Sequence, residues 1–148
     1  MTDIYISADI EADGPIPGQY SMLAFGLAVA GTFDGTTFEP RETGSATFYR
    51  ELRPISDQFD PAALGVARLD REVLARNGVE PAAAMRDAAE WVASQAQDTR
   101  PMFGGYSVVF DWMFMHSTPR AKDSGVVIFM NATRLLIRRV LTSSLACY

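Results

Sequence analysis

The sequence contains one cysteine, Cys147, and one histidine, His116, among its 148 residues. A single cysteine excludes an internal disulfide framework and is typical of proteins from a reducing compartment. No segment reaches the roughly 18 uninterrupted apolar residues that a membrane-spanning helix needs. The N-terminus also lacks the basic-then-apolar pattern of a signal peptide. We therefore expect a cytoplasmic protein without a membrane partner.

Basic residues are scarce in the larger part of the chain. Residues 1–116 carry 8 Lys or Arg against 17 Asp or Glu, whereas residues 117–148 carry 5 basic residues and one acid. The acidic part argues against wrapping duplex nucleic acid through a broad basic face. It does not exclude a phosphodiester held through bound metal ions, which supply positive charge locally. The change of sign also divides the chain, so we expect a domain over residues 1–116 and a divergent tail over residues 117–148.

The order of the local patterns predicts a mixed α/β (α+β) fold. Three short apolar or alternating stretches come first and predict a three-stranded antiparallel meander, helped by an Asp34-Gly35 turn signal. Helical patterns follow, and then one more strand and one more helix. The predicted strands span residues 4–11, 22–30, 46–52 and 101–106; the predicted helices begin at Asp60-Pro61, Asp70 and Pro81, and a last one spans residues 108–116.

The first predicted strand carries two carboxylates on one face. Every second residue from Ile4 to Ile10 is apolar, and the side chains of a strand alternate between its faces. Asp9 and Glu11 therefore lie side by side on the other face, at the end of the strand. Like charges this close repel and raise each other's pKa, and a divalent cation with oxygen ligands would relieve the repulsion. Two solvated acids at the end of an edge strand are the alternative interpretation.

Asp111 is a third candidate for the same site. It lies in the segment Val109-Phe110-Asp111-Trp112-Met113-Phe114, where bulky apolar residues surround it. Because burying a lone ionised carboxylate is costly, Asp111 should have a partner or a ligand. One interpretation is a helix-capping or arginine-paired aspartate. The other is a metal ligand that acts together with Asp9 and Glu11.

These segments resemble the two motifs of the DEDD superfamily of 3′-5′ exonucleases, the kind found in the epsilon subunit of DNA polymerase III. The first motif, D-x-E at the end of the first strand, matches Asp9-Ile10-Glu11. The second motif, an aromatic-Asp step that opens a helix, matches Phe110-Asp111. Residues 53–74 look like the helical linker of the family, and the resemblance covers about residues 1–116.

The resemblance implies a ribonuclease H-like fold and hydrolysis of terminal phosphodiesters to nucleoside monophosphates. In the family two divalent metal ions, Mg²⁺ or Mn²⁺, do this chemistry. The alternative for this chain is a site that holds one ion. The match implies that Asp9 contacts both metals, Glu11 the metal on the side of the nucleophile, and Asp111 the second metal through water. These three residues are the predicted catalytic and metal-binding set.

The predicted partner is the single-stranded 3′ end of a nucleic acid. By the same resemblance, the residues after the first motif would line the terminal nucleotide, and Ala12, Tyr20 and Met22 are the candidates. Core packing at the start of a strand is the alternative for Tyr20 and Met22, since apolar residues there are usually buried.

A third motif of the family is absent from the later part of the chain. That motif is His-x4-Asp or Tyr-x3-Asp on a late helix, and it supplies the general base and a fourth carboxylate. His116 follows directly on the second motif, Asp123 is seven positions further on, and Tyr148 is the last residue. The position of His116 near a helix end is explained by its favourable interaction with the helix dipole alone.

The tail therefore departs from the family, and we expect its structure to be atypical. Residues 125–130 are predicted to form a strand and residues 131–147 a helix with several arginines. That helix could pack normally or bind nucleic acid or a membrane surface. One hypothesis is a truncated or frame-altered family member with impaired exonuclease activity. The alternatives are an inactive module that binds nucleic-acid ends, and a domain in which the three acids coincide by chance.

Overall fold

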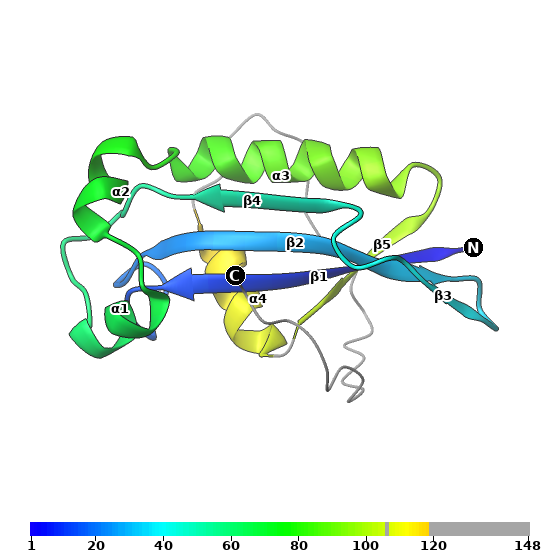
Figure 1. The fold of residues 1–148 in the computed structure, drawn as a ribbon, viewed down its shortest axis with the longest axis horizontal. Helices are drawn as coiled ribbons and strands as arrows, with labels where there is room; N and C mark the ends of the chain where they lie inside the picture. The colour runs from blue at the N-terminus through cyan, green and yellow to red at the C-terminus, as the bar shows by residue number, and fades with distance from the viewer. Residues whose placement is uncertain (106, 119–148) are drawn as a thin grey trace.

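The computed structural model describes residues 1–105 and 107–118 of the chain. A five-stranded mixed sheet lies at its centre, with helices beside it (Figure 1). This agrees with the predicted mixed α/β class. The strands are β1 (Asp3–Ala12), β2 (Met22–Phe33), β3 (Phe38–Pro40), β4 (Thr47–Glu51) and β5 (Arg100–Gly104), and the helices are α1 (Pro61–Ala67), α2 (Arg71–Asn77), α3 (Pro81–Ala96) and α4 (Val108–Ser117).

The predicted antiparallel meander is confirmed, with β2 at its centre. One edge of β2 pairs with β1 over its whole length, and the other edge pairs with β3 and β4 in turn. The sequence prediction missed the short strand β3, which follows the tight turn at Asp34. In that turn the Asp34 carboxylate accepts hydrogen bonds from the backbone N–H groups of Thr36 and Thr37. The last strand, β5, pairs with β1 in parallel.

The alternation predicted for β1 is confirmed. Ile4, Ile6, Ala8 and Ile10 are at most 7% exposed and belong to the core. Three of them join side chains of β2 and β4 beneath α3, which runs along the sheet beside β4 (Figure 1). Helix α3 contributes a buried stripe whose residues recur at the spacing of three and four that is typical of an amphipathic helix. This stripe consists of Pro81, Ala84, Met85, Ala88, Ala89, Val92 and Ala96.

Local capping signals place the short helices correctly. The Asp60 carboxylate accepts a hydrogen bond from the Ala62 N–H, and the Asp70 carboxylate accepts from Glu72 and Val73. Each aspartate thereby satisfies backbone donors that have no partner inside the helix. Both helices lie beyond the end of the sheet where β1 finishes (Figure 1).

Gly78 ends α2 for a different reason than its sequence predicts. A glycine after a helix usually supplies a left-handed residue, but Gly78 has a φ of −62°. A Cβ atom here would overlap the Leu74 carbonyl oxygen and the Arg53 amide nitrogen. The glycine is required because the backbone of the segment after β4 passes against it.

The predicted strand at 125–130 and the predicted helix at 131–147 lie outside the described residues, as do Tyr106, Asp123, Cys147 and Tyr148. In the part of the chain that the structure describes, no helix is both long and apolar enough to cross a membrane.

Candidate active site

The first motif lies where β1 extends past its parallel neighbour. Pairing between β1 and β5 stops at Ser7 and Gly104. Within the described residues, the rest of β1 therefore has a paired strand on one side only, that of β2. Asp9 is exposed here and Glu11 is half-buried, both on the face opposite the core. The unpaired side of β1 leaves room for α4, which contacts this strand.

Asp111 reaches the same place from α4. Ser107 is the residue that precedes this helix, and Asp111 lies in its first turn, so it is not the N-cap. Its side chain is only 4% exposed. A Cβ on Gly105 would lie 2.8 Å from Oδ2 of Asp111 and 3.0 Å from the Ala8 carbonyl oxygen. The absence of a side chain at Gly105 therefore lets this carboxylate lie against β1.

The electrostatics identify Asp9 as the common neighbour of the other two acids. Burial is the main cause that raises the pKa of Asp111 to about 6, and the negative charge of Asp9 is the second. A hydrogen bond from the Ile10 backbone partly offsets this rise. Burial and the charge of Asp9, in the same order, also raise the pKa of Glu11. The fold thus places Glu11 and Asp111 each within electrostatic reach of Asp9, at the end of β1.

No protein cation neutralises this group in the described structure. The ion pairs found among residues 1–105 and 107–118 join Arg50 to Asp87, Arg71 to Asp13 and Arg100 to Asp3. The arginine-paired interpretation of Asp111 is therefore not supported there. In the same residues, no three His, Cys, Asp or Glu side chains already stand in an arrangement that would hold a metal ion.

A fourth acid near the first motif has a different role, which the sequence analysis missed. Asp13 is completely buried. Its carboxylate lies 2.8 Å from Nε of Arg71 and accepts a hydrogen bond from the Ser21 N–H. Arg71 also donates to the Ser56 carbonyl oxygen. The partner of Asp13 comes from α2, far away in sequence, so no local pattern could have indicated it.

Ser21 extends this network to the segment after β4. Its hydroxyl oxygen accepts hydrogen bonds from the N–H groups of Ile55 and Ser56. The Asp60 N–H donates to the Asp13 carbonyl oxygen. These contacts fix the loop that follows the first motif against the segment that follows β4.

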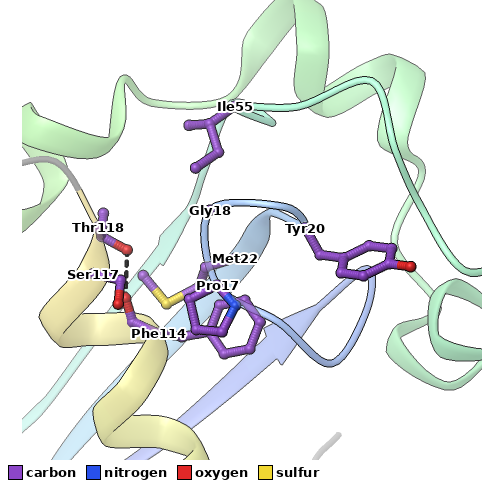
Figure 2. Close-up of a pocket in the computed structure, with 8 residues that line it drawn as sticks. All are labelled: Pro17, Gly18, Tyr20, Met22, Ile55, Phe114, Ser117 and Thr118. Atoms are coloured by element: carbon purple, nitrogen blue, oxygen red, sulfur yellow. Dashed lines mark hydrogen bonds between the residues drawn. The ribbon is translucent and has the colours of Figure 1, made fainter.

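A small pocket lies between that loop and the end of α4 (Figure 2). Two of the predicted substrate residues line it, Tyr20 and Met22, whereas Ala12 is half-buried at the end of β1. Met22 is also 4% exposed and part of the core. The other lining residues, which the sequence analysis did not propose, are Pro17, Gly18, Ile55, Phe114, Ser117 and Thr118.

The side chains of the pocket differ in direction. Figure 2 shows Met22, Pro17 and Phe114 gathered together, while the ring of Tyr20 extends away from them. The ring lies over Gly14, where a Cβ atom would overlap it. Thr118 closes the end of α4 by donating its hydroxyl hydrogen to the Phe114 carbonyl oxygen. His116 lies in the last turn of α4, the position that its helix-dipole interpretation requires.

No protein-family model matches the chain. The chain is 41% identical over 115 residues to the 3′-5′ DNA exonuclease Cap18 of Escherichia coli, an alignment that covers 77% of this chain and 56% of the relative. It thus spans little more than half the length of that curated relative.

Solved structures of exonuclease I share the fold. A product-bound structure has a TM-score of 0.55 at 16% identity, covering 78% of this chain and 24% of exonuclease I. E. coli exonuclease I in complex with a dT13 oligonucleotide has a TM-score of 0.54 at 16% identity, covering 76% and 22%. The resemblance drawn from the two motifs is confirmed: the chain is homologous to a 3′-5′ DNA exonuclease and has the ribonuclease H-like fold of exonuclease I.

Proposed function

We propose that this chain carries a metal-dependent 3′-5′ exonuclease activity that hydrolyses terminal phosphodiesters of single-stranded DNA to nucleoside monophosphates. The observation that carries the proposal is the carboxylate of Asp111, which is buried beside Asp9 and has no cation partner among the described residues. A buried carboxylate next to a second one is costly unless positive charge is supplied. A bound cation supplies that charge.

The donor set fits Mg²⁺ or Mn²⁺. Asp9, Glu11 and Asp111 offer only carboxylate oxygens, which are the ligands that hard divalent cations prefer. When bound, such ions activate the attacking water and neutralise the leaving oxygen. We propose that these three side chains hold the metal, and that Asp9, as the common neighbour, links the positions of the other two. Burial of Asp111 keeps competing water away from one side of this group.

We further infer where the substrate lies. The name of the relative and the oligonucleotide bound to exonuclease I both indicate DNA, which supports single-stranded DNA as the substrate here. Ala12, Tyr20 and Met22 follow the first motif, and Tyr20 and Met22 line the pocket at the end of α4, the helix that carries Asp111. We therefore propose that these three residues contact the terminal nucleotide. We also propose that residues 1–116 form the exonuclease domain and that the protein acts in the cytoplasm.

The test uses a 5′-labelled single-stranded DNA oligonucleotide, Mn²⁺ and the full chain. We expect a ladder of products shortened from the 3′ end, which disappears with a chelator and with Asp9→Ala. Glu39→Ala, at an exposed acid on β3, serves as the control. A phosphorothioate at the 3′-terminal linkage should block the ladder if degradation begins there.

A second outcome would support the alternative that this fold binds DNA ends without cutting them. In the family a third motif supplies the general base, and the sequence contains no match to that motif. Metal-dependent binding of the oligonucleotide with no shortened products would contradict the exonuclease proposal and establish the binding module.

A further inference from the structure

Tyr49 stands on the same face of the sheet as the acids of the first motif. Asp9 of β1 is the register partner of Gly26 in β2, and Gly26 is in turn the partner of Tyr49 in β4. Side chains in one such row point to the same face of a sheet. Asp9, Gly26 and Tyr49 therefore form a row across three strands.

The middle of this row is open because Gly26 has no side chain. A Cβ atom on Gly26 would lie 3.9 Å from Cδ2 of Tyr49, so the edge of the tyrosine ring lies beside Gly26, the residue between Tyr49 and Asp9 in this row. The neighbouring residues of β2 on this face are Ala24 and Ala28. Gly26 and Ala28 are half-buried, whereas Ala24 is completely buried. The accessible surface of β2 between Asp9 and Tyr49 is therefore that of small residues.

The neighbours of Tyr49 in β4 point to the opposite face and belong to the core side. Phe48 is buried under α3, and the Arg50 guanidinium lies 4.4 Å from the centre of the Phe48 ring. Tyr49, in contrast, is 54% exposed. Its hydroxyl donates a hydrogen bond to Glu51 at 3.3 Å, which helps to orient the ring on this face of the sheet.

The distance across this row suits one nucleotide. Neighbouring strands lie about 4.8 Å apart, so the backbone positions of Asp9 and Tyr49 are separated by roughly 10 Å. A nucleotide whose phosphate lies at the acids can extend its base across such a gap. Aromatic rings are the usual stacking surfaces for bases of single-stranded nucleic acids, and they accept any base.

We propose that Tyr49 is a base-stacking residue of the substrate site and holds a nucleobase of the strand whose terminal phosphate lies at Asp9. This inference rests on the proposed function, because it takes single-stranded DNA as the ligand. It adds a contact from β4, which neither motif contains. The competing explanation is structural, since an aromatic residue can cover a glycine on the neighbouring strand and stabilise the sheet.

The experiment measures binding of a fluorescent oligo-dT to the full chain in Ca²⁺, by anisotropy, for the wild type, Tyr49→Ala, Tyr49→Val and Tyr49→Phe. Stacking is expected to weaken binding by about 5- to 100-fold in the alanine and valine variants. Tyr49→Phe keeps the ring and should bind within about twofold of the wild type. Tyr49→Val keeps a good strand former at this position and covers the case in which the alanine variant does not fold.

A second oligonucleotide tests whether the contact is with a base. Abasic residues at the last two 3′ positions remove the bases and keep the phosphates, so wild type and Tyr49→Val should then bind equally. Phe38→Ala, at an exposed aromatic residue of β3 far from the acids, is the control. An equal loss with both oligonucleotides, or a lower melting temperature with unchanged binding, would overturn the stacking role.

The two proposals fail in different ways. If wild type neither binds nor shortens the oligonucleotide in any divalent metal, the exonuclease proposal is wrong. If wild type binds and shortens it, and Tyr49→Val does both equally well, only the role of Tyr49 is wrong.

Discussion

Nε of Arg71 lies 2.8 Å from Oδ2 of Asp13, and the side chain of Asp13 is completely buried. Residues 9–13, at the end of β1 and in the loop after it, therefore contain two kinds of acid. Asp13 is neutralised by a cation of the protein itself, whereas Asp9 and Glu11 have no such pair among the described residues. Two of these three neighbouring acids therefore remain available for a ligand.

Loss of Arg71 should destabilise the fold. Arg71→Met leaves the Asp13 carboxylate buried without its cation, and breaking a buried pair in this way typically costs about 3 kcal/mol or more. We expect that loss in the free energy of unfolding, measured in urea. Arg76→Met, at an exposed arginine of the same helix, should change it by less than about 0.5 kcal/mol. Similar values for the two variants would contradict the structural role of the Arg71 pair.

Gly105 should be required for activity although it offers no functional group. The Cβ of Gly105→Ala would lie 2.8 Å from the Asp111 carboxylate, so this acid has to move. Displacement of a catalytic group by about 1 Å can reduce turnover by about 100-fold. We expect the rate of oligonucleotide degradation to fall by about 10- to 100-fold.

The matched control for Gly105 is Gly65. Gly65 lies exposed in α1, and a Cβ atom added there would have nothing within 4 Å. Gly65→Ala should leave activity unchanged and stabilise the protein by about 0.5–1 kcal/mol, since alanine suits a helix better than glycine. Full activity of the Gly105→Ala variant would show that the position of Asp111 is not critical.

Asp111 should make the metal-free protein less stable as the pH rises. Its pKa is about 6 in the folded chain against an ordinary value of 3.8, so the folded state holds this proton more tightly than the unfolded state. The free energy of unfolding therefore falls as the pH rises between about 4 and 6, and above pH 6 the whole of this loss is present. In a chelator at pH 7, Asp111→Asn should be more stable than wild type by urea unfolding.

Addition of Mn²⁺ should reverse this order, because only the wild type gains binding energy from the metal. Asp57→Asn, at an exposed loop acid, provides the control for the loss of one charge. A difference between wild type and Asp111→Asn that is the same at pH 4 and pH 7 would contradict the assigned cause.

Met22 allows its two predicted roles to be separated. It is 4% exposed in the core and also lines the pocket. Met22→Ala should lower the free energy of unfolding by about 2–5 kcal/mol through loss of buried volume, whereas Met22→Leu should cost less than about 1.5 kcal/mol. If Met22 also contacts the terminal nucleotide, the KM of Met22→Leu for the oligonucleotide should rise while its stability is nearly unchanged.

Local patterns in the sequence determined several features that the structure shows. The alternation of β1 fixed both its buried face and the side of Asp9 and Glu11, because strand periodicity is a property of neighbouring residues. The capping aspartates Asp60 and Asp70 were likewise predictable, since each bonds to backbone groups two or three residues away. The two motifs predicted the homology to 3′-5′ exonucleases and the ribonuclease H-like fold.

Other features depended on contacts between distant segments, and only the tertiary structure decided them. Asp13 and Arg71 form an ion pair over 58 residues of chain, Asp111 reaches Asp9 from another element, and Tyr49 shares a row with Asp9 through Gly26. A sequence pattern records the spacing of residues along the chain. Which buried carboxylate meets a cation, and which aromatic residue shares a sheet face with an acid, depends on strand register and helix packing, and these are set by the folded core as a whole.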